Sequence, residues 1–349
     1  MIIAHRLACA EERRRAAAKH RGVPIPGILA VAAIAAAAWV AGVRVPLLGA
    51  PVLALLAGLI IRNGAGAMAA LGPGVDFTLK RLLRLAIILY GATLSFAQVI
   101  QIGTGSFVVI AVTIVFALGL TWLFGRWLRA PAGLVNLIGV GTAICGATAI
   151  ITIGPIIEST EEEIAFAVTT IFLFNMLAVV VYPLLGHVWS LPDSVYGVWA
   201  GAAIHDTSSV LAASFVFSEP AGKVATVVKL TRTLALVPLA LIYGLAHSYA
   251  RSGGRPGGAR VNLVKIFPWF ILWFVLAALL NSAGLVGPDG GRWASLTGKF
   301  LVVMVMAAVG LSADLKRMRE IGLRPLYIGL AASVMIAVVS IVLIRVVVE

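Results

Sequence analysis

Residues 197–212 have the sequence GVWAGAAIHDTSSVLA. Its flanks are apolar, but five consecutive polar residues, from His205 to Ser209, interrupt its centre. A carboxylate at mid-depth in a bilayer costs at least about 2.5–3.5 kcal/mol. Asp206 is therefore expected to serve a binding site, or to cap a half-helix that itself forms one. The pattern predicts an interrupted helix within residues 194–218. The candidate binding residues in it are His205, Asp206, Thr207 and Ser208.

Residues 131–157 contain a second interruption, centred on VGTAICGATAI at 140–150. Glycine costs roughly 1 kcal/mol against alanine inside a helix, and Gly139, Gly141 and Gly146 cluster here with hydroxyl side chains. Small residues also serve close helix packing, but their concentration favours a broken helix or a re-entrant hairpin. Unwound backbone at that depth must line a cavity or be buried in protein. The candidate binding residues here are Thr142, Cys145, Gly146 and Thr148.

Two cations lie deep in a later apolar segment, residues 222–247. Lys229 and Arg232 are three positions apart, so they share one helix face. At about 1.5 Å per residue they lie too far inside the segment to reach the nearer surface comfortably. An ion pair with Asp206 would neutralise only one of them. The remaining positive charge predicts that the site binds a small anion, with both cations among its ligands.

The composition points to a membrane protein. The 349 residues are 61% hydrophobic and 12% charged, against about 45–50% and about 25% in an average soluble domain. This excludes a soluble globular enzyme, a disordered chain and a coiled coil. We expect an all-α polytopic membrane protein in which residues 23–349 form a single transmembrane transporter domain. The roughly 11 expected segments are 24–42, 47–61, 85–103, 105–125, 131–157, 164–186, 194–218, 222–247, 263–283, 296–313 and 326–347.

The charge of the chain follows its expected topology. The 27 Lys and Arg against 14 Asp and Glu give a net charge of +13. If residues 1–22 form a basic cytoplasmic tail and every segment crosses, most cations fall on the cytoplasmic side, as the positive-inside rule predicts. The tail lacks the apolar core of a signal peptide and is expected to touch anionic lipid headgroups. We therefore expect a multi-pass protein of the cell inner membrane with a cytoplasmic N-terminus. Its partner is the lipid bilayer rather than nucleic acid.

A faint internal repeat relates the two interruptions, because GTAI at 141–144 is matched by GAAI at 201–204. A second weak sequence similarity relates residues 89–95 to residues 308–314. Two discontinuous elements from two repeats, meeting near the bilayer midplane, form the usual substrate site of secondary transporters. The sequence thus predicts an inverted-repeat transporter with two discontinuous or re-entrant elements. It leaves open whether those elements cross the membrane or form hairpins.

Four motifs occur in one order: GTAICGATAI at 141–150, YGVWAGAAIHD at 196–206, VKLTR at 228–232 and IFPWF at 266–270. With them the chain resembles the YeiH-type sulfate exporter family over roughly residues 24–347. That family is similar to the bile-acid, arsenite and cation–proton antiporter transporters. The resemblance implies a fold of inverted repeats with crossed discontinuous helices.

The residues predict a secondary transporter of a small anion, and the resemblance implies that it is an exporter of an anion such as sulfite or sulfate. Its midplane site would combine residues 139–150 and 200–210 with the two buried cations. A cation- or proton-coupled antiporter or symporter of organic anions is the alternative. An intramembrane enzyme using His205 and Asp206 would need a nucleophile with a base or at least three metal ligands, so no catalytic residue, metal or cofactor is expected. His205, which titrates near neutral pH, is the candidate for proton coupling, and a homo-oligomer is a further expectation.

Overall fold

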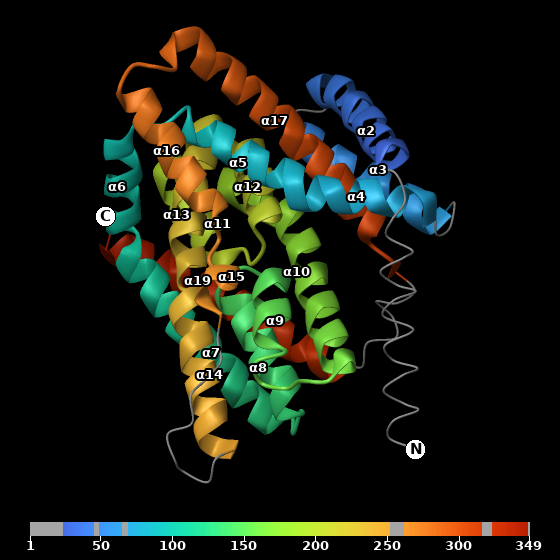
Figure 1. Cartoon of the computed structure of the whole chain (residues 1–349), viewed down its shortest axis with the longest axis vertical. Helices are drawn as coiled ribbons and strands as arrows, with labels where there is room; N and C mark the ends of the chain where they lie inside the picture. The colour runs from blue at the N-terminus through green and yellow to red at the C-terminus, as the bar shows by residue number, and fades with distance from the viewer. Residues whose placement is uncertain (1–23, 45–48, 65–68, 252–261, 316–322, 348–349) are drawn as a thin grey trace. The chain divides into compact units, whose positions relative to one another are not determined.

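The computed structural model describes residues 24–44, 49–64, 69–251, 262–315 and 323–347 (Figure 1). Throughout these ranges the regular structure is helical and no strand occurs, so the predicted all-α class is confirmed. The predicted basic tail, residues 1–22, lies outside them.

Six of the described helices are long and apolar enough to cross a membrane, by length and composition. A further pair, Gly72–Gly91 and Phe96–Gly105, meets the same criterion together but bends by 106°, which makes up to seven spans. The sequence predicts one uninterrupted segment over 85–103, where the structure has this bend. The count of about 11 segments and the inverted repeat stay predictions. The six helices are Ile25–Arg44, Phe107–Trp127, Glu161–Val188, Glu219–Tyr249, Gly287–Ser312 and Pro325–Val346.

The chain divides into two compact units. The smaller consists of Met1–Leu85 with Phe300–Asp314, and the larger of Ala86–Lys299 with Leu315–Glu349. The prediction that residues 23–349 form a single transporter domain stays a prediction.

In the smaller unit, α2 (Ile25–Arg44) packs along α3 (Gly49–Gly64). The end of α3 is tied to the residues that follow α17 (Gly287–Ser312), because Arg62 forms an ion pair with Asp314 at 3.2 Å. These contacts hold two distant parts of the sequence together.

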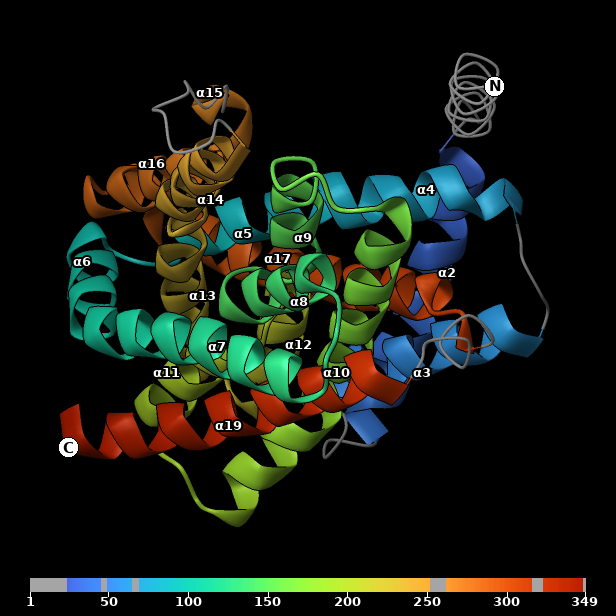
Figure 2. The ribbon, with the colours of Figure 1, turned by 90° about the horizontal axis from the view of Figure 1, so that it is seen from below.

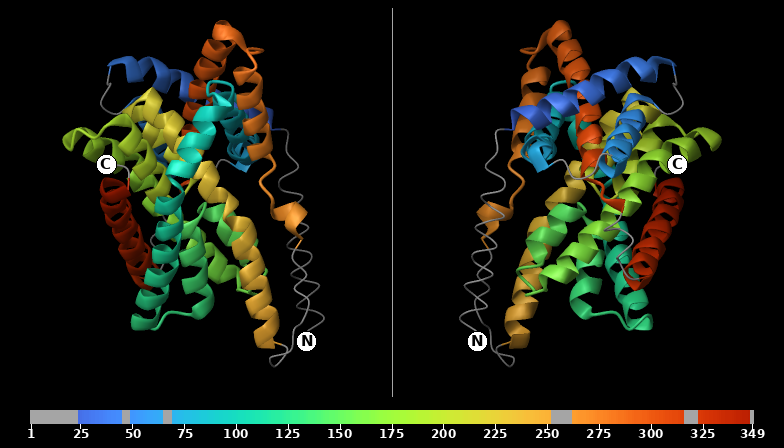
Figure 3. Two further views of the ribbon diagram at one scale, coloured as in Figure 1. Left: turned by 90° about the vertical axis from the view of Figure 1, so that its left-hand side faces the viewer. Right: turned by 90° about the vertical axis from the view of Figure 1, so that its right-hand side faces the viewer.

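In the larger unit, α7 (Phe107–Trp127) packs against α8 (Ala132–Ala143) and against α19 (Leu323–Val347). Figures 2 and 3 show α19, in red, lying along α7, in teal. On the other side of α8, α10 (Glu161–Val188) packs against α8 and α12 (Thr207–Phe217). The short helices α8 and α12 are thus enclosed by longer apolar ones, which permits them to end inside the protein.

Helix α13 (Glu219–Leu234) packs against α11 (Asp193–Ala203) and α12 over most of its length. Gly201 makes this approach possible, since a Cβ at that position would lie 2.8 Å from the Val228 Cβ. The close packing brings the middle of α13, with its two cations, to the end of α11.

Candidate functional site

Both predicted interruptions are confirmed as breaks between short helices. Residues 144–146 separate α8 from α9 (Ala147–Ile153), and residues 204–206 separate α11 from α12. Gly146 has φ +64°, a conformation that residues with a Cβ rarely adopt. The break after α8 therefore depends on glycine at this position.

The two breaks lie against each other. A Cβ built on Gly146 would lie 3.4 Å from the Asp206 Cβ and 3.6 Å from its Cα. Asn175 of α10 joins this contact, because its side-chain oxygen accepts from the Asp206 backbone N–H at 3.1 Å. The predicted approach of Cys145–Gly146 to His205–Asp206, with non-helical backbone, is confirmed. Their depth in a bilayer stays a prediction.

Lys229 of α13 is fully buried, and its ammonium group donates to both broken ends. Its Nζ lies 2.7 Å from the Ile144 carbonyl oxygen and 3.0 Å from that of Ile204, and it also donates to the His205 carbonyl. These acceptors match the three ammonium hydrogens. The last carbonyls of a helix lack intrahelical partners and carry the negative end of the helix dipole, so the cation stabilises the ends of α8 and α11.

Arg232, one turn further along α13, is also fully buried and acts on the same two ends. Its Nε donates to the Ala143 carbonyl at 2.7 Å and its Nη2 donates to the Thr142 carbonyl. Its Nη1 donates to the Ala202 carbonyl at 2.6 Å and to the Ile204 carbonyl at 3.3 Å. The planar guanidinium thus joins the end of α8 to the end of α11.

Asp206 caps α12, and among the described residues it forms no ion pair with Lys229 or Arg232. Its Oδ2 accepts from the Ser208 backbone N–H at 2.9 Å and from the Ser208 hydroxyl. The capping role that the sequence suggested is therefore present, whereas the ion pair it offered as an alternative is not. The two cations and the one carboxylate leave one formal positive charge at the breaks.

The His205 ring joins the break to α19. Its Nε2 lies 2.8 Å from the Ser333 Oγ, and that hydroxyl donates to the Gly329 carbonyl at 2.7 Å. Because the single hydroxyl hydrogen is used, Ser333 accepts from His205, which places the ring hydrogen on Nε2. Nδ1 is buried and has no hydrogen-bond partner within the described part of the chain.

The other predicted site residues fall on both sides of the breaks. Thr142 is buried, and its hydroxyl bonds to the Ile138 carbonyl at 2.7 Å. Cys145 is a buried free thiol within the first break. Thr148 is exposed at the start of α9, whereas Thr207 is buried at the start of α12.

Sequence reasoning missed two polar side chains at this site, Asn175 and Ser333. Asn175 is 4% exposed within the apolar helix α10, and a buried amide in such a segment is a signal that could have found it. Ser333 lies in a small-residue stretch of α19 and carries no comparable signal. The backbone carbonyls that bind the two cations could not be predicted from the sequence, because every residue has a backbone carbonyl.

The described helices and their breaks define a multi-pass helical membrane protein whose two interrupted helices are joined by buried cations. Residues 26–329 match the family model described as conserved hypothetical protein 698, and the chain belongs to that family.

The curated relatives are named as membrane proteins. The chain is 37% identical over 326 residues to the UPF0324 membrane protein of Clostridium tetani, covering 90% of this chain and 94% of the relative. It is 34% identical over 326 residues to a UPF0324 membrane protein of Streptococcus agalactiae serotype V, covering 90% and 95%. One from Streptococcus pneumoniae strain R6 is 37% identical over 299 residues, covering 84% and 88%. These similarities extend over nearly the whole chain and support a multi-pass membrane protein.

Proposed function

We propose that this protein is a secondary transporter that exports a small inorganic oxyanion, of the sulfite or sulfate type, across the inner membrane. The N-terminus would lie in the cytoplasm. One observation carries the proposal: Lys229 and Arg232, both fully buried, join two broken helices at a point where Asp206 supplies the negative charge. Discontinuous helices that meet inside a membrane domain form the substrate sites of many secondary transporters.

The charge at the breaks supports an anionic substrate. The donors of Lys229 are already matched by backbone carbonyls, so its contribution to substrate binding is the field it creates rather than a direct contact. That field is strong because the surroundings are buried and of low dielectric. The amino end of α12, the positive end of its dipole, starts at the same place. A cation site would instead need surplus carboxylates at the breaks.

A proton could enter the cycle at His205. Its Nδ1 lone pair has no partner among the described residues, and protonation there would add a positive charge beside the bound anion. The loaded site would then carry an anion and a proton together, so a proton gradient could drive the movement of the anion.

The enzyme alternative has less support. His205 bonds to Ser333 and Asp206 bonds to Ser208, so the two side chains have separate partners. A catalytic pair would need the base and its orienting carboxylate in contact.

Uptake by purified protein in proteoliposomes tests the proposal. Sulfite, sulfate, thiosulfate and small carboxylates are offered as labelled substrates, and sodium and proton fluxes are followed in parallel. We expect saturable uptake of a sulfur oxyanion. Uptake of small carboxylates alone would favour the organic-anion alternative, and sodium–proton exchange without anion movement would overturn the proposal.

A further inference from the structure

An open polar cavity of about 690 Å³ lies in the larger unit, with a lining separate from the two breaks. Lys223, Arg292 and Lys299 line it, and Glu219 is the carboxylate of the lining. These four side chains leave two formal positive charges around the cavity. A cavity lined by charges of one sign concentrates ions of the opposite sign.

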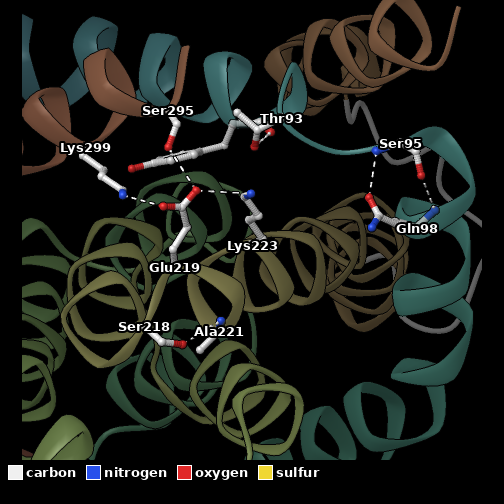
Figure 4. A network of polar contacts seen from close by, with 10 residues as sticks. Thr93, Ser95, Gln98, Ser218, Glu219, Ala221, Lys223, Ser295 and Lys299 are labelled. Carbon is white, nitrogen blue, oxygen red and sulfur yellow. Dashed lines mark hydrogen bonds and ion pairs between the residues drawn. The ribbon is translucent and has the colours of Figure 1, made fainter. Parts of the chain in front are cut away.

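Glu219 holds the centre of this cluster (Figure 4). Its Oε2 accepts from the Lys299 Nζ at 2.5 Å, and its Oε1 lies 3.2 Å from the Lys223 Nζ and accepts from the Ser295 hydroxyl at 3.2 Å. The carboxylate thus occupies donors that an oxyanion could use. Arg292 is exposed and forms no ion pair among the described residues, so its guanidinium remains available for bidentate recognition.

A second observation points to a further polar ligand beside the cluster. Tyr90 is fully buried, and its hydroxyl has no hydrogen-bond partner in the described ranges. The side chain lies within electrostatic range of Glu219. A Cβ built on Gly298, next to Lys299 in the chain, would lie 3.1 Å from the ring carbon that bears the hydroxyl. A buried donor without an acceptor is costly, so this hydroxyl adds to the unmet polar demand beside the cluster, although Tyr90 itself does not line the cavity.

The cavity lies where two candidate spans begin. Glu219 is the first residue of α13 and Gly287 the first of α17, so the cavity is expected at the end of these spans rather than inside the bilayer. Helix α13 also carries Lys229, ten residues after Glu219, which corresponds to a distance of about 15 Å along the helix. One helix therefore connects this cavity with the breaks.

We propose that Lys223, Arg292 and Lys299 form a cationic basin that binds a small tetrahedral oxyanion in competition with the Glu219 carboxylate. The basin would bind the anion before it reaches the transport site. This role in transport rests on the proposed function, whereas the binding itself does not. Ion pairs that only stabilise the start of α13 would account for Glu219, but they would not account for Arg292, which lines the same cavity without an ion pair among the described residues.

Binding of labelled sulfate to the purified full chain in detergent tests the basin. Glu219→Gln removes the competing charge and is expected to strengthen binding about tenfold, whereas Lys299→Ala is expected to weaken it about tenfold. Glu162→Gln and Lys80→Ala make the same charge changes outside the cavity lining and should leave the affinity unchanged. Sulfate affinities of Glu219→Gln and Lys299→Ala equal to that of the wild type would overturn the inference.

The oxyanion has two sources, free sulfate or phosphate and the phosphate of a lipid headgroup. Displacement of labelled sulfate by inorganic phosphate, equally in nanodiscs of phosphatidylglycerol and of phosphatidylcholine, would support the free ion. The headgroup would be supported if sulfate binds in phosphatidylcholine nanodiscs but not in phosphatidylglycerol nanodiscs. Weaker binding by Lys299→Ala in phosphatidylcholine would show that this sulfate occupies the basin.

The binding readout separates this inference from the proposed function. Tighter sulfate binding by Glu219→Gln, with no oxyanion uptake by proteoliposomes of the wild type, would support the basin and overturn the proposed transporter function. Intact uptake, with the same sulfate affinity in all variants, would overturn the basin alone.

Discussion

The Nζ of Lys229 lies 2.7 Å from the carbonyl oxygen of Ile144, 85 positions earlier in the chain. The same ammonium group reaches the end of α11 through Ile204, so one side chain joins two broken helices. The partial negative charges at those ends account for the burial of a cation there. In this arrangement Lys229 holds the breaks together and sets the charge that a substrate would meet.

Replacing Lys229 by methionine, which has similar length but no donor, should lower the thermal stability. Buried carbonyls lose their partner, and each unsatisfied group costs about 1–3 kcal/mol. Thermal unfolding of the purified protein, followed by tryptophan fluorescence, measures the effect. The control is Thr231→Val on the same helix, which removes only a bond to the Val227 carbonyl. An unchanged melting temperature together with lost transport would instead make Lys229 a direct ligand of the substrate.

Asp206→Asn and Asp206→Ala separate the cap from the charge. Asparagine is as good a helix cap as aspartate, whereas alanine costs typically about 1 kcal/mol. We expect Asp206→Asn to keep the melting temperature of the wild type. It should bind the transported anion more tightly, because loss of the carboxylate charge makes the net charge at the breaks more positive by one. Asp206→Ala should be less stable. Equal destabilisation by the two variants would indicate that the negative charge, not the cap, stabilises the fold.

Gly146→Ala should impair both stability and transport. A Cβ at φ +64° is strained, and such backbone strain costs of order 1–3 kcal/mol. The new methyl group would lie in ordinary van der Waals contact with Asp206 and Ile171, each 3.4 Å away, so the cost comes from the backbone conformation. The matched control is Gly119→Ala in α7, where a Cβ meets nothing within 4 Å. Thermal unfolding and uptake are compared, and equal behaviour of both variants would contradict the assigned break.

His205→Gln tests proton coupling. Glutamine keeps a donor for Ser333 but cannot take a proton near neutral pH. If the lone pair on His205 Nδ1 accepts the coupled proton, the anion affinity of the wild type rises as pH falls, because the protonated ring adds positive charge. The variant should show a flat profile. The test is the anion affinity measured between about pH 5.5 and 8, which brackets the usual histidine pKa. A wild-type affinity that does not change with pH would remove His205 from the coupling.

The breaks could be predicted from sequence because polar and glycine residues cluster inside apolar stretches around Gly146 and Asp206. The bend at residues 91–96 also had a signal in the sequence, since Ser95 and Gln98 form a capping box. The partners of Lys229 could not be predicted, because backbone carbonyls have no residue-specific pattern. The contact of His205 with Ser333 spans 128 positions and depends on the packing of α19, which local sequence does not specify.

The central claim, that the joined breaks bind the transported anion, is tested most directly by protection of a thiol at Thr148. This residue is exposed at the start of α9, so Thr148→Cys, combined with Cys9→Ser and Cys145→Ser, offers one target to a hydrophilic thiol reagent. Thr104→Cys, at another exposed position, is the control. The account predicts that sulfate slows labelling at position 148 saturably, whereas gluconate at equal ionic strength does not. Unchanged labelling at position 148, or equal protection at position 104, would contradict it.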